Sequence, residues 1–186
     1  MILSKIIKGV SSYIKLFFLK IIYFKNLKLN KFWPIFLGKG TDINLSNKGS
    51  QLIIEGNLVC RNNVNLKVTN GRLKIGNNVF FNNNTSVTCR KKIVIGDDCL
   101  FGESVKVYDH DHNFRKSKLI RTQGFTEKEV EIGNNVWIGS NSVILKGVNI
   151  GDNVVIASGT IINKDIPDNC IAYNQKSLNI KYIEYK

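Results

Sequence analysis

Near the C-terminus, isoleucine recurs at every sixth position. A small residue often follows it, and the residues four places on, such as Val136 and Ser142, are mostly small or β-branched. A period of six fits neither an α-helix nor the alternation of a single strand, and a fixed repeat is typical of stacked structural units. We predict that three strands of about six residues close one triangular coil of roughly 18 residues, with isoleucine pointing inward. The repeating positions are Ile132, Ile138, Ile144, Ile150, Ile156 and Ile162.

The same period occurs earlier in the chain, less regularly. Ile54, Ile75 and Ile95 each begin a coil, at spacings of 21 and 20 residues. We interpret the extra residues as small corner loops, where glycine and asparagine adopt left-handed backbone angles. One coil is unable to bury its own apolar face, so several must stack. Later positions in these coils keep the inward phase: Phe81, Phe101 and Val107.

The first 31 residues form a basic segment with seven lysines and no acidic residue. Their apolar residues have helical spacing, so an amphipathic helix is predicted. Lysines interrupt each long apolar run, which argues against a spanning helix of ~20 apolar residues. No small-residue cleavage site follows an apolar core, which argues against a signal peptide. Two interpretations stay open: residues 1–31 contact an anionic membrane, or they pack on the domain or a neighbouring subunit. The apolar positions are Leu3, Ile7, Val10, Ile14, Phe17 and Ile21.

The composition is that of a globular domain, with 43% hydrophobic and 22% charged residues. A net charge of +13 suggests a nucleic acid, a membrane surface or a phosphorylated substrate as partner, or serves solubility alone. We find no phosphate-binding loop, dinucleotide motif or nucleic-acid module, so no nucleic-acid partner is expected. Cysteines 60, 89, 99 and 170 lack metal-site spacing and indicate buried thiols in a reducing, cytoplasmic compartment.

Between Val107 and Ile132 the six-residue period breaks. This stretch contains YDHDHNF at 108–114 and with it both histidines of the chain, His110 and His112, each behind an aspartate. A long irregular loop inside a regular array is usually functional. The pair alone is compatible with half of a metal site, with a general base and its neighbour, or with a polar loop of no special role.

The run IGNNVWIGSNSVILKGVNIGDNVVIASGTIINKDIP, residues 132–167, resembles the hexapeptide-repeat acyltransferases. It is most similar to maltose and galactoside acetyltransferases and polysaccharide O-acetyltransferases, over roughly residues 50–170. The resemblance implies an all-β fold, a left-handed parallel β-helix with a short N-terminal amphipathic helical segment and an extended catalytic loop. We expect a basic helical region and lead-in at 1–50, the β-helix at 51–170 with loop 108–131, and a tail at 171–186. The resemblance also implies a homotrimer that uses acetyl-coenzyme A (acetyl-CoA) in clefts between subunits.

The same resemblance assigns the candidate site residues. An ungapped match of the loop makes His112 the general base, with His110 as second choice. Asn82 matches a site asparagine, with Asn84 as fallback, and Trp137 matches a tryptophan beside the cleft. After KDIP the chain departs from the family and keeps only Asn174, although a late lysine, Lys176 or Lys181, is expected to meet a coenzyme phosphate. The donor-binding positions are Trp137, Ser140, Ser158, Lys164 and Lys181.

Acetyl transfer to a hydroxyl needs a base, and histidine titrates near neutral pH. Asp109 or Asp111 would fix the imidazole tautomer, and an asparagine amide or a backbone N–H would stabilise the oxyanion. No cysteine is needed, because transfer is direct in a ternary complex. Some left-handed β-helices are zinc carbonic anhydrases, but their site needs three histidines, so no metal is expected.

The leading hypothesis is an acetyl-CoA-dependent O-acetyltransferase acting on a saccharide hydroxyl. The saccharide would be a cell-surface polysaccharide or its lipid-linked precursor, at the inner face of the membrane. One alternative is N-acetylation of an amino sugar nucleotide, although the relatives that do this carry a separate N-terminal domain. Others are a small-molecule or antibiotic acetyltransferase, and a non-catalytic scaffold that would not bind acetyl-CoA. The sequence does not name the acceptor.

Overall fold

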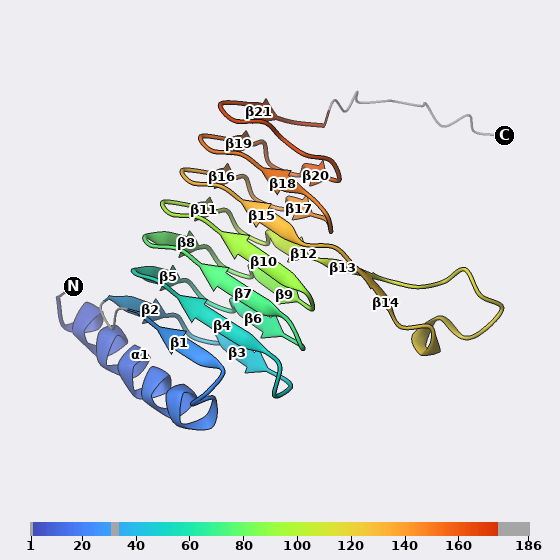
Figure 1. The fold of residues 1–186 in the computed structure, drawn as a ribbon. Coiled ribbons are helices and arrows are strands. Elements are labelled where there is room, and N and C mark those ends of the chain that lie inside the picture. The colour runs from blue at the N-terminus through green and yellow to red at the C-terminus, as the bar shows by residue number, and fades with distance from the viewer. Residues whose placement is uncertain (1, 31–33, 175–186) are drawn as a thin grey trace, which may run out of the picture.

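The chain folds into a parallel β-helix, a prism of stacked coils with one helix at its N-terminal end (Figure 1). This computed structural model describes residues 2–30 and 34–174. Three sheets, of six, seven and six strands, form the three faces of the prism, and every pairing within them is parallel. The predicted fold class is therefore confirmed.

The strands of each face are given in stacking order. Face A consists of β1 (Leu27–Leu29), β4 (Gln51–Ile54), β7 (Arg72–Ile75), β10 (Lys92–Ile95), β15 (Val130–Ile132) and β18 (Asn149–Ile150). Face B consists of β2 (Ile35–Leu37), β5 (Leu58–Cys60), β8 (Val79–Phe81), β11 (Leu100–Phe101), β16 (Trp137–Ile138), β19 (Val155–Ile156) and β21 (Ile171–Ala172). Face C consists of β3 (Asp42–Leu45), β6 (Asn65–Val68), β9 (Ser86–Cys89), β12 (Lys106–Tyr108), β17 (Val143–Ile144) and β20 (Ile161–Ile162).

The core runs along the axis of the prism, where the inward side chains of the three faces meet. Strand residues alternate between inside and outside, and all six isoleucines of the regular repeat are buried. Phe81 and Phe101 stack one coil apart with ring centroids 4.7 Å apart, and both are buried. The inward phase expected for the irregular coils is confirmed by these two residues and by Val107.

The corners of the prism need left-handed backbone angles, as the sequence predicted. Asparagine supplies most of the residues with positive φ, including Asn78, Asn84, Asn135 and Asn153. Asparagine visits this region more readily than other residues with a Cβ atom. Asn135 Nδ2 also donates to Asn153 Oδ1 at 3.0 Å, so one corner residue supports the next coil.

The prism begins before residue 51. β1, β2 and β3 form a complete coil, and they pair with β4, β5 and β6. This first coil lies within residues 1–50, where the sequence predicts only a helical region and a lead-in, because its strands carry no clear six-residue isoleucine signal. Helix α1 (Ile2–Ile22) precedes it and packs on β2. Among the described helices, none is long and apolar enough to span a membrane.

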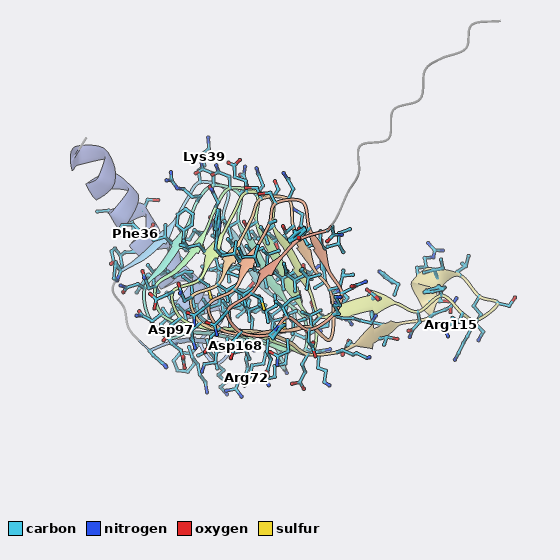
Figure 2. The ribbon with its side chains drawn as sticks, turned by 90° about the horizontal axis from the view of Figure 1, so that it is seen from above. Phe36, Lys39, Arg72, Asp97, Arg115 and Asp168 are labelled. Carbon is cyan, nitrogen blue, oxygen red and sulfur yellow. The ribbon has the colours of Figure 1, made fainter. Side chains whose placement is uncertain are left out.

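A single excursion, residues 109–129, leaves the prism between β12 and β15. We call it the arm. It contains β13 (His110–His112) and β14 (Phe125–Glu127), an antiparallel pair, with a short 3-10 helix, η1 (Ile120–Thr122), between them. Figure 2, a view turned by 90°, shows the arm projecting well beyond the triangular outline, with Arg115 labelled on it and α1 on the other side.

Candidate active site

The arm holds both histidines on a short β-ribbon. His110 pairs with Glu127 and His112 with Phe125. Residues two apart on a strand point to the same side, so the two imidazoles share one side of the ribbon. The Phe125 ring lies against both: its centroid is 4.4 Å from that of His112 and 5.4 Å from that of His110. Apolar packing therefore fixes the positions of two polar rings.

Asp109 anchors the base of the arm and contacts His110. It is fully buried, and its oxygens accept from the backbone N–H groups of Arg90 at 2.8 Å, Lys91 at 2.7 Å and Lys92 at 3.0 Å. His110 Nδ1 lies 3.0 Å from Asp109 Oδ1. Because a carboxylate only accepts, Nδ1 carries a proton in this contact. The expectation that a neighbouring aspartate fixes an imidazole therefore applies to His110.

His112 has a different environment. It is exposed and lines an open groove of about 520 Å³, whereas His110 is not among the lining residues. Lys146, at the corner after β17, forms an ion pair with Asp111 beside it. Asn113 binds across the ribbon to the hydroxyl of Thr126 and to the carbonyl of Gln123. The groove is therefore lined by an imidazole, a carboxylate and an ammonium group.

The other predicted residues lie along two edges of the prism. We call the edge where face B turns into face C the BC edge, and the edge where face C turns into face A the CA edge. The arm and Lys146 lie on the CA edge. Lys164, which is exposed, lies on this edge one coil further on, because β17 and β20 pair Ile144 with Ile162.

Asn82, Ser140 and Ser158 lie on the BC edge, each just after a strand of face B. Ser140 Oγ accepts from the N–H of Glu103 at 3.1 Å. A Cβ atom on Gly139 would lie 2.6 Å from the backbone nitrogen of Ser158, so only glycine fits at this close approach of two coils. The close approach of two coils at the BC edge therefore explains why a glycine, Gly139, follows the isoleucine at this point of the repeat.

Asn82 makes a local hydrogen bond through its side-chain oxygen, and its side-chain amide nitrogen is available as a donor. Its Oδ1 accepts from the N–H of Asn83 at 2.9 Å, and its own N–H donates to the carbonyl of Phe101 at 3.0 Å. Within residues 2–30 and 34–174, its Nδ2 has no hydrogen-bond partner. The side chain therefore presents an amide donor at the BC edge.

One chain by itself does not bring the predicted residues together. The histidines and Lys164 lie on the CA edge, whereas Asn82, Ser140 and Ser158 lie on the BC edge, with face C between them. Trp137 lies outward on face B and is 54% exposed. Lys181 and Lys176 lie outside the described residues.

The buried cysteines stay protonated. Burial raises the pKa of Cys60 to about 12 and that of Cys99 to about 11. Burial and the nearby Asp109 carboxylate also raise the pKa of Cys89. A nucleophilic cysteine needs a lowered pKa and access to the substrate, so these three thiols do not fit the role of an acyl carrier. In the described ranges, no cluster of three or more His, Cys, Asp or Glu side chains is arranged to hold a metal.

Sequence reasoning missed two features of this region. The first is Lys146, which only the stacking of β17 beside the arm brings to the groove.

The second is a continuous ladder of outward apolar side chains on face B, which the strand register aligns from one end of the prism to the other. Its signal in the sequence is an apolar residue directly before each inward residue of this face. We call it the face B ladder: Phe36, Val59, Phe80, Leu100, Trp137, Val155 and Ile171.

Comparisons with known proteins agree with this architecture. The family model described as bacterial transferase hexapeptide (six repeats) matches residues 129–164. The galactoside O-acetyltransferase of Escherichia coli (strain K12) is 41% identical over 104 residues, which are 54% of this chain and 49% of that protein. In general, this chain spans about half the length of the curated relatives it matches.

Two solved structures extend the likeness. The maltose O-acetyltransferase of Clostridium difficile 630 is 30% identical, with 78% of this chain and 71% of that chain covered and a TM-score of 0.50. The hexapeptide-repeat acetyltransferase VCA0836 of Vibrio cholerae O1 biovar eltor, solved with acetyl coenzyme A, is 25% identical. That match covers 74% of this chain and 65% of that chain, with a TM-score of 0.51.

Proposed function

Because this chain belongs to the hexapeptide-repeat acetyltransferase family, we propose that it transfers the acetyl group of acetyl-CoA to a hydroxyl of a saccharide. Acetyl-CoA supplies the acetyl group as a thioester. The saccharide is suggested by the relatives named as acetyltransferases of galactosides and maltose. The acceptor would be a cell-surface polysaccharide or its lipid-linked precursor.

The residues available for the donor fit its chemistry. Trp137 and Ile171 offer exposed apolar surface on face B, at 54% and 70% exposure, for the pantetheine chain. Ser140 and Ser158 would supply polar contacts along the BC edge. Lys164 is an exposed cation for the phosphates. Because the serines lie on the BC edge and Lys164 lies on the CA edge, the donor would bind in a cleft between two copies of the chain.

His112 is proposed as the general base, because it is the imidazole that opens on the groove. It takes the proton of the acceptor hydroxyl while the hydroxyl oxygen attacks the thioester carbonyl carbon. The Asn82 amide donates to the oxygen that becomes negative. When the carbon–sulfur bond breaks, the imidazolium returns the proton to the leaving sulfur. The products are an acetyl ester and free coenzyme A, and no acyl-enzyme is formed.

His110 is proposed as a positioning residue. Its Nδ1 is bound to Asp109, which three backbone N–H groups hold in a buried site. The Phe125 ring then connects His110 to His112 on the same side of the ribbon. The pair of aspartates therefore separates into two roles: Asp109 fixes the arm on the prism, and Asp111 pairs with Lys146 at the groove.

We propose that the active protein is a homotrimer. A neighbouring copy would bring its BC edge, with Asn82 and the serines, to the arm on the CA edge of the first copy. The face B ladder supports association, because Leu100 is half exposed beside Trp137, so that the subunit contact would continue into the surface proposed for the pantetheine chain. The outward residues of face A, by contrast, include Lys28, Lys74 and Glu131.

The observation that carries the proposal is the break in the solenoid that places two histidines on an arm beside an open groove. Calorimetry with acetyl-CoA tests the donor half, and we expect one site per chain. Binding that weakens in Trp137→Ala but persists in His112→Ala would agree with the assigned roles. No binding at millimolar acetyl-CoA would leave a non-catalytic scaffold as the better description.

The acceptor half is tested by release of free coenzyme A thiol over a panel of acceptors. The panel includes galactosides, maltose, a lipid-linked glycan and an amino sugar nucleotide. Turnover with the hydroxyl acceptors supports O-acetylation, whereas turnover restricted to the amino sugar would replace it with N-acetylation. Sedimentation analysis of the same sample gives the number of chains, and a catalytically active monomer would contradict the shared site.

A further inference from the structure

Helix α1 has apolar residues on two opposite sides. Its inner side packs on the first coil through Leu16 and Leu19, which are buried, and through Ser12. Ser12 Oγ accepts from the N–H of Leu37, at the end of β2, at 2.9 Å. Figure 1 shows α1 lying alongside β1 and β2 at the N-terminal end of the prism. The inner side accounts for one apolar stripe of the helix.

The second stripe is exposed on the outside of the helix. With 3.6 residues per turn, its members lie on the side of α1 away from Leu16 and Leu19 and continue into the turn that follows. Every member is more than half exposed, and four of them are phenylalanine or isoleucine at the C-terminal end of α1. An exposed apolar patch of this kind on a folded domain marks a contact surface. We call it the outer face: Val10 53%, Ile14 55%, Phe17 64%, Phe18 57%, Ile21 59%, Ile22 68% and Phe24 71%.

The charged residues that follow α1 in the chain, up to residue 41, are all basic. No acidic residue precedes Asp42 in the chain. Lys25 and Lys28 are exposed just after α1, and Lys48 is exposed near them, since the Asn26 side chain donates to the Lys48 carbonyl at 3.0 Å. The segment that carries the outer face is therefore apolar and is followed directly by exposed ammonium groups.

Two lysines within α1 itself, Lys15 and Lys20, point toward the prism. Lys15 Nζ donates to the carbonyl of Thr41, and Lys20 Nζ donates to the carbonyl of Leu27. Both carbonyl groups belong to the first coil, and these contacts satisfy them. They also hold the rotation of α1 about its own axis, so that the outer face stays turned away from the prism.

We propose that the outer face binds the surface of an anionic lipid bilayer, with α1 lying in the plane of the headgroups. Phe17, Phe18 and Ile21 would enter the boundary between headgroups and acyl chains, and Lys25, Lys28 and Lys48 would meet the lipid phosphates. A second copy of the chain fits this surface less well. A two-fold contact would bring the same lysines of both copies together without an acidic partner.

This placement leaves the candidate active site accessible. Figure 2 shows α1 and the arm projecting from different sides of the prism. The bilayer would contact the N-terminal end of the prism and leave the arm in water. The proposal goes beyond acetyl transfer and does not depend on it, because lipid binding requires neither donor nor acceptor.

Vesicle sedimentation with the full chain tests the proposal. We expect the protein to partition onto vesicles of phosphatidylcholine with phosphatidylglycerol, and much less onto phosphatidylcholine alone. The double variant Phe17→Ser/Ile21→Ser should lower the partition coefficient at least about tenfold, because two exposed apolar side chains are lost from the contact. The triple variant Lys25→Gln/Lys28→Gln/Lys48→Gln should lower it and flatten its salt dependence.

Matched controls use the same residue types on the arm. Leu119→Ser/Ile120→Ser removes two exposed apolar side chains, and Lys118→Gln removes an exposed charge. Both should leave the partition unchanged. Thermal melting and acetyl-CoA calorimetry on each variant establish that it is folded, so failure to bind lipid and failure to bind donor are read separately.

Three outcomes would overturn the proposal. In the first, the full chain does not partition onto anionic vesicles. In the second, the Phe17→Ser/Ile21→Ser variant partitions as strongly as the unaltered chain. The third outcome is that the double variant, without any change in vesicle binding, lowers the number of chains found by sedimentation. The outer face would then be a contact between copies of the chain.

Discussion

The prism and the arm are built on different physical rules. In the prism, each coil repeats the same pattern of inward apolar positions, and each strand between the two ends of a face pairs with the coils above and below. In the arm, most side chains are exposed, and one antiparallel pair, one buried carboxylate and a few ion pairs hold the ribbon. The prism is a scaffold that tolerates little change in its interior, and the arm is where polar residues are free to carry chemistry. Variants matched between the two regions test this division.

The largest effect is expected at the groove. His112→Ala should lower kcat/KM by about 10²–10⁴-fold, the usual contribution of a general base, while leaving the melting temperature unchanged. Coenzyme A release measures the first quantity and calorimetric melting the second. Lys118→Ala, also exposed on the arm, is the control and should retain activity. If His110→Ala proves more damaging to activity than His112→Ala, the roles of the two histidines must be exchanged.

A phenylalanine in each region gives the next comparison. Phe101→Ala removes a fully buried ring that stacks on Phe81, and we expect it to lower the free energy of unfolding by about 3–5 kcal/mol. Phe114→Ala removes a ring that is 65% exposed on the arm, and its effect should stay within about 0.5 kcal/mol. Urea denaturation measures both. Equal losses would mean that the arm is as much a part of the folding core as the prism.

Asp109 connects the two regions, so its removal should affect both stability and activity. Asp109→Asn leaves the N–H donors of Arg90, Lys91 and Lys92 without a full set of acceptors around a buried side chain, which should cost about 1–3 kcal/mol of stability. We expect kcat to fall less than in His112→Ala, with a changed pH profile, because the tautomer of His110 is no longer fixed. A stable variant with an unchanged pH–rate profile would remove the positioning role.

The smallest effect is expected at the surface of the arm. Arg90 Nε binds Glu127 Oε1 at 3.0 Å, with the side chains 23% and 34% exposed. Partly exposed ion pairs contribute little, so Glu127→Gln should lower the free energy of unfolding by less than about 1 kcal/mol. High salt should mask this difference in urea denaturation. A loss above about 2 kcal/mol would show that the ion pair is needed to keep Arg90 over the Phe125 ring, where it lies 3.7 Å from the centroid.

The period of the sequence predicted much of the fold, because that signal is local and repeated. Inward residues such as Ile138 and Ile156 recur at the interval that the triangular coil requires, and asparagines supply the corners. The coil at residues 27–45 escaped the prediction, since its strands lack the isoleucine repeat and only pairing with β4–β6 defines it.

The candidate site divides in the same way. The sequence by itself determined that the chain stacks hexapeptide coils and that its two histidines lie where the period fails. It did not distinguish His110, bound to a buried Asp109, from His112, open on a groove beside Lys146. The contacts that hold Asp109 in its buried site and bring Lys146 to the groove join residues 17 to 35 positions apart, and only the stacking of whole coils decides them. The same holds for the outer face of α1. Helical spacing marks its residues as apolar, but only packing on β2 decides which apolar side is buried and which is left to meet a partner.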